Sequence, residues 1–289
     1  MRPRHKGLLE MFLATFIWGS IPLFSIWCGL PSPVFVFFRV LFAFPFMLAY
    51  SLKKLKLREL LRIKPVAPLI MSGVALSLNW IFFFWAIQIT DIATAVILYY
   101  FGPVFTIILA VIFLKEPLSK TLIFATLIAF AGAFLTFFQS FDYHGSLFGV
   151  IVAFASGFFY GLLGFISKIA TYDHSSLKIT TYQILIATLF TLPFIFMFHF
   201  TLTPFKVFLL FVTGIVHTGL ALFLWYDSLN YISVSTSAVF SYLDPFFAIL
   251  LGFIFLHQRP GLLQIAGGVL IAISGIIISI KESKTPEAP

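Results

Sequence analysis

The chain has 289 residues, of which 61% are hydrophobic and only 10% are charged, and its mean hydropathy is +1.09. Soluble globular proteins carry about 25% charged residues, so this composition excludes a water-soluble globular protein. Apolar runs of roughly 18 or more residues recur along the whole length, as in membrane-spanning helices. We therefore predict a polytopic integral membrane protein.

Proline, glycine and charged residues divide the chain into ten predicted helices. In chain order they span residues 8–27, 33–51, 67–88, 92–114, 120–138, 146–168, 178–198, 205–228, 234–256 and 261–280. At about 1.5 Å rise per residue, each can cross a hydrocarbon core of roughly 30 Å. The first has the basic start of a signal peptide, but its apolar stretch is long and no clear cleavage site follows, so we expect a retained span. We expect residues 281–289 to form a disordered cytoplasmic tail.

Positive charge is distributed unevenly over the connections between these helices. With both termini in the cytoplasm, 15 of the 18 Lys and Arg residues fall on the cytoplasmic side, in agreement with the positive-inside rule. This topology explains the net charge of +8 without a nucleic-acid partner. The basic cluster at 53–64 also suits lipid headgroups, although topology alone accounts for it. We expect a multi-pass protein of the cell (inner or plasma) membrane with cytoplasmic N- and C-termini.

The two halves of the chain align at a constant offset of 142 residues. TDIATAVILYYFGPVFTIILAVIFLKEP (90–117) lies over ISVSTSAVFSYLDPFFAILLGFIFLHQR (232–259), and the same offset sets Gly19 over Gly161. The second and seventh helices do not keep this register. Each half has five spans, an odd number, so the two copies insert in opposite senses, as in many secondary transporters. We predict an all-α fold of two inverted five-helix repeats, residues 8–138 and 146–280, around a central cavity.

Motifs of one known family occur in the same order in this chain. They are Trp18-Gly19, Arg39, Pro103, the run Leu114-Lys115-Glu116-Pro117-Leu118 and Gly132, followed in the second copy by Pro245 and Gly275. Together they resemble the EamA-type transporters of the drug/metabolite transporter superfamily, over residues 8–280. The resemblance implies ten helices around a cavity that carries small metabolites, often outward. The chain departs from the pattern at Gln258, which stands where the first repeat has Glu116.

Asp244 lies near the middle of the ninth helix, directly before Pro245. A charged Asp at the centre of a bilayer costs about 2.5–3.5 kcal/mol, so such residues usually face a cavity or a partner. One interpretation makes Asp244 a contact for a substrate cation or a proton-coupling carboxylate. Another makes it the N-cap of a half-helix that starts at Pro245, after a break at Leu243–Asp244; the two are compatible. Gly102-Pro103 is equivalent in the first repeat, so the break is predicted to be shared and the carboxylate unique.

Further candidates are polar or polar-tipped residues within the spans. The candidates for substrate binding or coupling besides Asp244 are Tyr99, Tyr242, Trp18, Tyr160, His217, Asn79 and Ser241. Aromatic residues at equivalent repeat positions suit a cavity wall that holds aromatic or cationic groups, with interface anchoring as the alternative. For the remaining candidates, helix packing is the alternative. Arg39 is expected to be a structural charge, with an ion pair to Asp244 left open, and Pro103 and Pro245 are expected to break their helices.

No Walker-type loop, nucleophile elbow or HExxH motif is present, and the single Cys28 allows no intrachain disulfide and no Cys-rich metal site. We therefore expect no enzyme activity, no cofactor and no metal. The leading hypothesis is a secondary transporter that moves an amino acid or related polar or amphipathic metabolite by alternating access, coupled to protons or another gradient. The alternative is a membrane subunit or lipid-headgroup flippase acting with partners. Expected partners are a small-molecule substrate and the lipid bilayer; a homodimer is left open.

Overall fold

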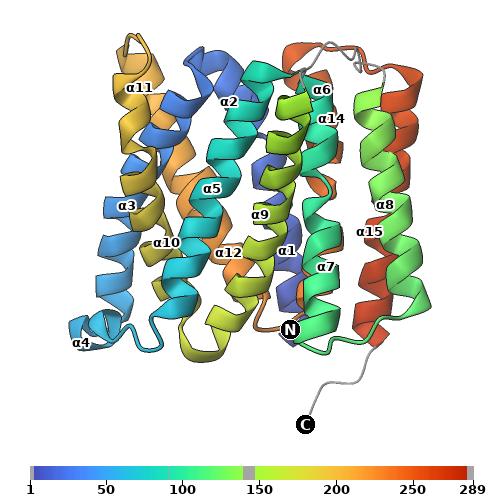
Figure 1. The fold of residues 1–289 in the computed structure, drawn as a ribbon, viewed down its shortest axis with the longest axis horizontal. Coiled ribbons are helices and arrows are strands. Elements are labelled where there is room, and N and C mark those ends of the chain that lie inside the picture. Colours follow the sequence, from blue (N-terminus) through green and yellow to red (C-terminus); the bar gives the residue numbers. More distant parts are fainter. Residues whose placement is uncertain (1–2, 91, 139–146, 285–289) are drawn as a thin grey trace.

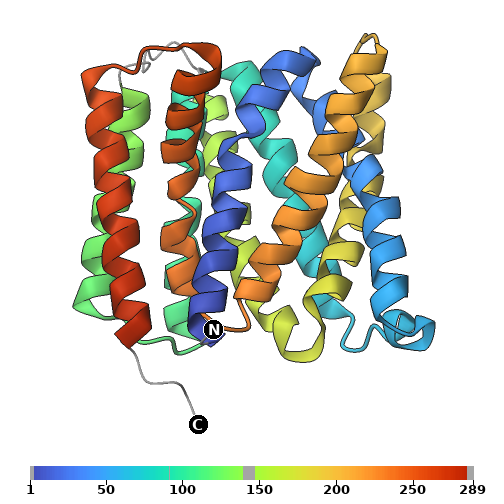
Figure 2. The same ribbon diagram turned by 180° about the vertical axis from the view of Figure 1, so that it is seen from behind.

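The computed structural model describes residues 3–90, 92–138 and 147–284. All regular structure in these ranges is helical, and ten spans are long and apolar enough to cross a membrane. Figures 1 and 2 show the helices standing side by side, with the start of the first helix and the end of the last helix at the same end of the bundle. We call this end the terminal end and the opposite one the far end. The predicted ten-helix architecture is confirmed.

The first five spans contain eight helices. They are α1 (Pro3–Gly19) and α2 (Ile21–Cys28), α3 (Ser32–Lys54), the short α4 (Leu57–Leu61), α5 (Ala67–Ile89), α6 (Ile92–Tyr99) and α7 (Gly102–Phe113), and α8 (Lys120–Phe138). Within them, α1 with α2 and α6 with α7 each form one interrupted span.

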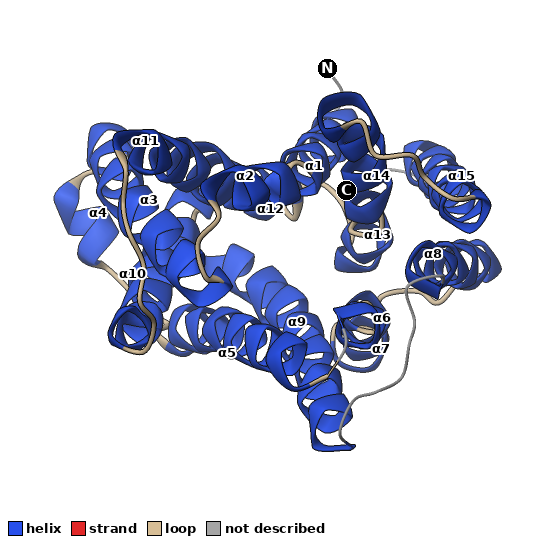
Figure 3. Cartoon of the chain, turned by 90° about the horizontal axis from the view of Figure 1, so that it is seen from above, coloured by secondary structure: helices blue, strands red, loops and turns tan. Residues whose placement is uncertain are grey.

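The last five spans repeat the interruption of the fourth span but not that of the first. They are α9 (Leu147–Asp173); α10 (Ser176–Thr191) with the 3₁₀ helix η1 (Leu192–Phe196); α11 (Pro204–Val212), the π-helix η2 (Thr213–Leu220) and α12 (Ala221–Ser228); α13 (Val234–Phe240) and α14 (Leu243–Leu256); and α15 (Leu262–Lys284). Seen along the helices, α5 packs beside α9 and α8 beside α15, so each pair joins one helix of each repeat (Figure 3).

The C-terminal tail is shorter than predicted. Helix α15 continues to Lys284, so the expectation of a disordered segment from residue 281 is wrong for residues 281–284. The physical reason is local: Glu282 is buried and accepts a hydrogen bond from the Thr236 hydroxyl at 2.7 Å, which holds the last turn against α13. Residues 285–289 lie outside the described residues.

The fourth and ninth spans are interrupted at equivalent places, which confirms the predicted shared break. Helix α6 ends before Tyr100, and α13 ends before Ser241. A proline removes the hydrogen bond to the carbonyl four residues earlier. For Pro103 and Pro245 those carbonyls belong to Tyr99 and Ser241, where the breaks begin.

The predicted position of the second break is wrong. Helix α14 already begins at Leu243, its N-cap residue is Tyr242, and no side chain caps it. Asp244 therefore lies within the first turn and is not the N-cap, because the proline acts on the turn before it. The carboxylate therefore makes no capping hydrogen bond at the helix start.

The repeat also recurs in backbone detail at the ends of α7 and α14. Lys115 and His257, 142 positions apart, are the only non-glycine residues of the described chain with positive φ, at 59° and 53°. The next residue in each copy, Glu116 or Gln258, donates its backbone N–H to a carbonyl six residues earlier, at 3.3 and 3.2 Å. The two copies therefore share the same helix termination.

Equivalent glycines bring helices into contact in both halves. A Cβ on Gly161 would lie 2.4 Å from the Cβ of Phe105, and a Cβ on Gly19 would lie 2.4 Å from the Cβ of Phe247. Because the obstacles include the first side-chain carbon and nearby backbone, they cannot move aside cheaply. Only glycine allows α9 to cross α7, and α1 to cross α14, at this distance.

We expect Gly161→Ala to destabilise the protein by about 1–3 kcal/mol, the usual cost of an overpacked site. Gly268→Ala is the matched control, because a Cβ there meets only the Phe246 ring at 3.4 Å. Thermal unfolding of both variants in detergent measures the difference. Equal midpoints for the two variants would show that the crossing tolerates a methyl group.

Candidate functional site

A cavity of about 550 Å³ lies between the two repeats. Its wall includes Trp18, Leu222 and Tyr160 at mid-depth, and Ser32 and Gln258 beside the connections at the far end. The cavity therefore opens toward the far end of the bundle. Below it, toward the terminal end, lies a small pocket of about 10 Å³, lined by residues that include Pro103, Ser241 and Ala238. The predicted central cavity is confirmed.

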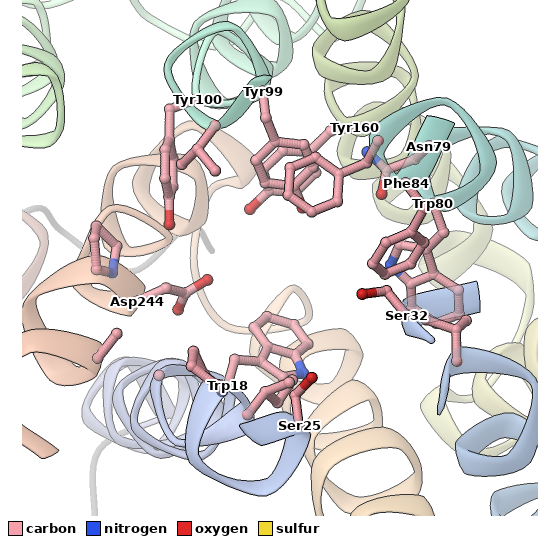
Figure 4. A pocket seen from close by; sticks show the side chains of 18 of the residues that line it. Trp18, Ser25, Ser32, Asn79, Trp80, Phe84, Tyr99, Tyr100, Tyr160 and Asp244 are labelled. Atoms are coloured by element: carbon pink, nitrogen blue, oxygen red, sulfur yellow. The ribbon is translucent and has the colours of Figure 1, made fainter. Parts of the chain in front are cut away.

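Aromatic rings form a large part of the cavity wall (Figure 4). Tyr99 stacks on Tyr160 with ring centroids 4.8 Å apart, and Phe83 packs at 4.8 Å from Tyr99. On the opposite side, Trp18 meets Trp225 edge to face at 5.7 Å. Such walls bind apolar and aromatic bodies, and their π faces also attract cations. Of the predicted site residues, Trp18, Tyr99 and Tyr160 lie on this wall.

Asp244 projects into the cavity between Trp18 and Tyr100 (Figure 4). Its Oδ1 atom is buried and has no hydrogen-bond partner. Asp244 forms no ion pair with a described residue, and Lys6 pairs with Glu10 and Asp227 instead. The carboxylate is therefore the one acid on the described cavity wall, and the protein leaves it unneutralised.

Arg39 is the one base on the same wall, but it does not pair with Asp244. Its Nε donates to the Thr218 hydroxyl at 2.8 Å and its Nη2 to the His217 carbonyl at 3.3 Å. The guanidinium also lies 5.3 Å from the Trp80 ring centroid. The ion pair left open above is therefore wrong: η2 presents a carbonyl and a hydroxyl to Arg39, and these bind the guanidinium on its own side of the cavity.

The carboxylate is unique to one side of the cavity for a steric reason. At the equivalent position of the first repeat, a Cβ on Gly102 would lie 2.3 Å from Cδ1 of Tyr160. Tyr160 therefore fills the room that a side chain at that position would need. Sequence alignment of the repeats predicts this asymmetry, and the ring packing explains it.

Three predicted candidates lie behind the wall of the main cavity. Tyr242 is fully buried, stacks on Tyr100 at 5.8 Å and donates its hydroxyl to the Tyr100 carbonyl at 2.9 Å. Ser241 donates to the Ser237 carbonyl at 3.2 Å and lines only the small lower pocket. The ring of His217 shares a hydrogen bond of 2.8 Å with the Ser20 hydroxyl. These side chains act through packing and hydrogen bonding in the structure as it stands.

Asn79 reaches the cavity wall from α5 and donates to the Ser156 carbonyl of α9 at 3.0 Å. Other polar residues on the wall were not predicted from the sequence. They are Ser25, Ser32, Thr136, Gln258 and Gln264. Serine and threonine in apolar helices carry no signal that separates a cavity from a helix contact. Gln258 is the exception, because its mismatch with Glu116 in the repeat marks it as unusual.

The terminal end of the cavity is closed by a polar cluster around α13. Glu116 accepts the backbone N–H of Val234 at 2.9 Å with one oxygen and that of Ser235 at 3.1 Å with the other. Lys168 donates to the carbonyls of Leu229 and Ile232 in the preceding connection. We call Glu116, Lys168 and the Glu282 contact described above the α13 latch.

A second polar contact lies beside the latch. Lys6 donates to Asp227 at 2.8 Å and to the Tyr231 hydroxyl at 2.7 Å, and Ser176 donates to Asp227 at 2.9 Å. These bonds join α1, α10 and α12 to the same connection. At the far end, Gln258 instead folds back: a Cβ on Gly252 would lie 2.7 Å from its Oε1. The two ends of the cavity therefore differ: hydrogen bonds hold the terminal end closed, and the far end is open.

Comparison with known proteins agrees with this architecture. The model of the EamA-like transporter family matches residues 5–138 and again residues 147–280. A crystal structure of a protein shares the fold with a TM-score of 0.84 at 18% identity, covering 96% of this chain and 99% of that one.

Curated relatives match over nearly the whole chain. It is 29% identical to the "Uncharacterized transporter YxxF" of Bacillus subtilis, covering 93% of this chain and 88% of the relative. It is 26% identical to "Protein RarD" of Escherichia coli, covering 89% and 88%. It is 29% identical to the "Pseudopaline exporter CntI" of Pseudomonas aeruginosa, covering 95% and 96%. Since the family model matches both repeats, the chain belongs to the EamA-like transporter family and is a multi-pass membrane transporter.

Proposed function

We propose that the protein is a secondary transporter that moves an amino acid or a related polar or amphipathic metabolite across the cytoplasmic membrane by alternating access. The observation that supports this most is a cavity between two inverted repeats, open at the far end and closed at the terminal end by the α13 latch. Inverted repeats can exchange conformations, and such an exchange would open the same site to either side in turn.

The orientation follows from the basic residues. Helix α4 and its flanks, with their cluster of Lys and Arg, lie at the terminal end together with both termini. Positive charge favours the cytoplasmic side, so the terminal end is cytoplasmic in this proposal. The structure then corresponds to the outward-open state, with the latch as the cytoplasmic gate.

Asp244 supplies a route for coupling transport to a gradient. A carboxylate in a cavity can bind either a proton or a positively charged group, and binding one displaces the other. Trp18 and Tyr100 flank it, and the hydroxyls of Tyr99, Tyr100 and Tyr160 interact with it electrostatically. Arg39 is held on its own side of the cavity by neutral partners. Competition at Asp244 would exchange protons for cargo without any hydrolysis of ATP.

Site-directed cysteine labelling tests alternating access. In a Cys28→Ser background, Ser25→Cys lies on the open cavity and Ala238→Cys lies on the closed pocket below it. A membrane-impermeant maleimide is expected to modify the first cysteine only from outside and the second only from the cytoplasmic side. In a protein that carries both cysteines, modification of one is expected to prevent modification of the other. Simultaneous labelling of both cysteines from one side would indicate a channel and contradict the proposal.

A further inference from the structure

We propose that Asp244, Trp18 and Tyr100 form a cation subsite that binds a protonated or quaternary nitrogen of the cargo, whose remaining body is apolar or aromatic. This inference rests on the proposed function, because it takes the central cavity as the cargo site. It goes beyond that function by stating which chemical group the cavity selects and where that group binds.

The first argument is the unsatisfied carboxylate. Buried polar atoms in proteins are almost always hydrogen-bonded, and an exception calls for a specific explanation. Oδ1 of Asp244 is buried without a partner, yet the side chain points into a cavity large enough for a ligand. A donor that arrives with the cargo would give this carboxyl group the hydrogen bond that the protein does not provide. An ammonium group has such donors and carries the complementary charge.

The second argument is that the protein does not neutralise this charge itself. Arg39 is bound to Thr218, the His217 carbonyl and the Trp80 ring. Lys6 binds Glu10 and Asp227. The carboxyl group of Asp244 is therefore available to a ligand.

The third argument is the aromatic surface on both sides of the carboxylate. Trp18 and Tyr100 flank Asp244 in the cavity (Figure 4). Aromatic faces attract cations, and the effect strengthens where water is excluded. The stacked pair of Tyr99 and Tyr160, with Phe83, continues the wall and gives an apolar body a surface to pack against. A carboxylate with rings beside it selects a cation with an apolar body over a hydrated metal ion.

The fourth argument is that the cavity has one such subsite and not two. The equivalent position in the first repeat is Gly102, where Tyr160 leaves no room for a side chain. The cargo therefore binds in one orientation, with its nitrogen toward α14 and its body toward the aromatic pair.

The test uses three probes that share a phenethyl body: phenethylamine, 2-phenylethanol and 3-phenylpropanoate. They are cationic, neutral and anionic at neutral pH. Binding to the full chain in nanodiscs is followed by tryptophan fluorescence, since Trp18, Trp80 and Trp225 line the cavity. We expect the amine to bind about tenfold to a hundredfold more tightly than the alcohol, as for one charge-assisted hydrogen bond, and the carboxylate to bind most weakly. Equal binding of amine and alcohol, or tighter binding of the carboxylate, would overturn the subsite.

Substitutions test whether the preference for the amine arises at Asp244. Asp244→Asn is expected to reduce amine binding to the level of the alcohol while changing alcohol binding less than about twofold. Glu59→Gln on the exposed surface of α4 is the matched control and should leave the preference unchanged. A preference that survives in Asp244→Asn would contradict the assignment. The comparison of probes on the unmodified chain decides the charge preference even if this variant does not fold.

Transport assays separate this inference from the proposed function. An amine preference in binding, without amine transport in proteoliposomes, would overturn alternating access and leave the cation subsite standing. Transport that shows no preference for the amine would overturn the subsite and leave the transporter assignment standing.

Discussion

Asp244→Asn is expected to leave the protein folded but to abolish or uncouple transport. The substitution keeps the shape of the side chain and removes its charge. The carboxylate has no ion pair, and its Oδ1 accepts no hydrogen bond, so the fold loses little. A cargo or proton that binds there loses its partner. Amine uptake driven by a pH gradient should fall about tenfold to a hundredfold, the value of one charge-assisted contact.

Proteoliposomes with an imposed pH gradient and labelled phenethylamine provide the measurement. The Glu59→Gln variant serves as the control for a lost surface carboxylate, and thermal unfolding of each variant shows whether it is folded. A folded Asp244→Asn protein with undiminished, pH-driven uptake would exclude Asp244 from the mechanism. Uptake that persists at a lower rate but no longer responds to the gradient would indicate uncoupling.

The fold could be predicted from the sequence because two strong signals agree. Apolar runs of bilayer length give the ten spans, and the constant offset of 142 residues gives the inverted repeat. The repeat also holds in structural detail that the sequence did not predict. Gly19 and Gly161 lie at equivalent helix crossings, and Lys115 and His257 lie at equivalent helix ends. Features that depend on local backbone chemistry therefore follow the repeat closely.

Side-chain pairing within the bundle could not be predicted in the same way. The depths of Arg39 and Asp244 in the membrane allow an ion pair, but depth does not determine which groups face each other. The π-helix η2 provides the His217 carbonyl and the Thr218 hydroxyl for Arg39, and no residue pattern in residues 213–220 marks it. Likewise, Tyr242 matches Tyr100 in the repeat, yet only Tyr100 lines the main cavity.

The mismatch between Glu116 and Gln258 in the repeat corresponds to a difference between the closed and the open end of the cavity. At the terminal end, the carboxylate of Glu116 binds two backbone N–H groups of α13. At the far end, the amide of Gln258 lies against its own helix at Gly252 and lines the mouth of the cavity. The two pseudo-symmetric ends of the bundle therefore differ, with a carboxylate at the terminal end and a neutral amide at the far end. A charged acceptor at backbone N–H groups stabilises the closed terminal end more than an amide would stabilise the other end.

We expect Glu116→Gln to shift the protein toward the state that opens at the terminal end. Glutamine offers one acceptor oxygen, so one backbone N–H of Val234 or Ser235 loses its partner and the charge is lost. Hydrogen bonds to charged groups contribute about 1.5–3 kcal/mol, which corresponds to a population change of about tenfold to a hundredfold. In the Cys28→Ser, Ala238→Cys background, labelling from the cytoplasmic side should accelerate by about that factor.

Glu282→Gln is expected to weaken the α13 latch less than Glu116→Gln does. Its carboxylate accepts the hydroxyl of Thr236 at 2.7 Å, and a glutamine oxygen can still accept that bond. Its effect on labelling of Ala238→Cys should therefore be smaller than that of Glu116→Gln, while both variants keep the unfolding temperature of the parent within a few degrees. Equal labelling rates in the parent and in Glu116→Gln would show that the contact to α13 does not hold the gate. Faster labelling together with a large loss of thermal stability would indicate local unfolding of α13 in place of a shift between two folded states.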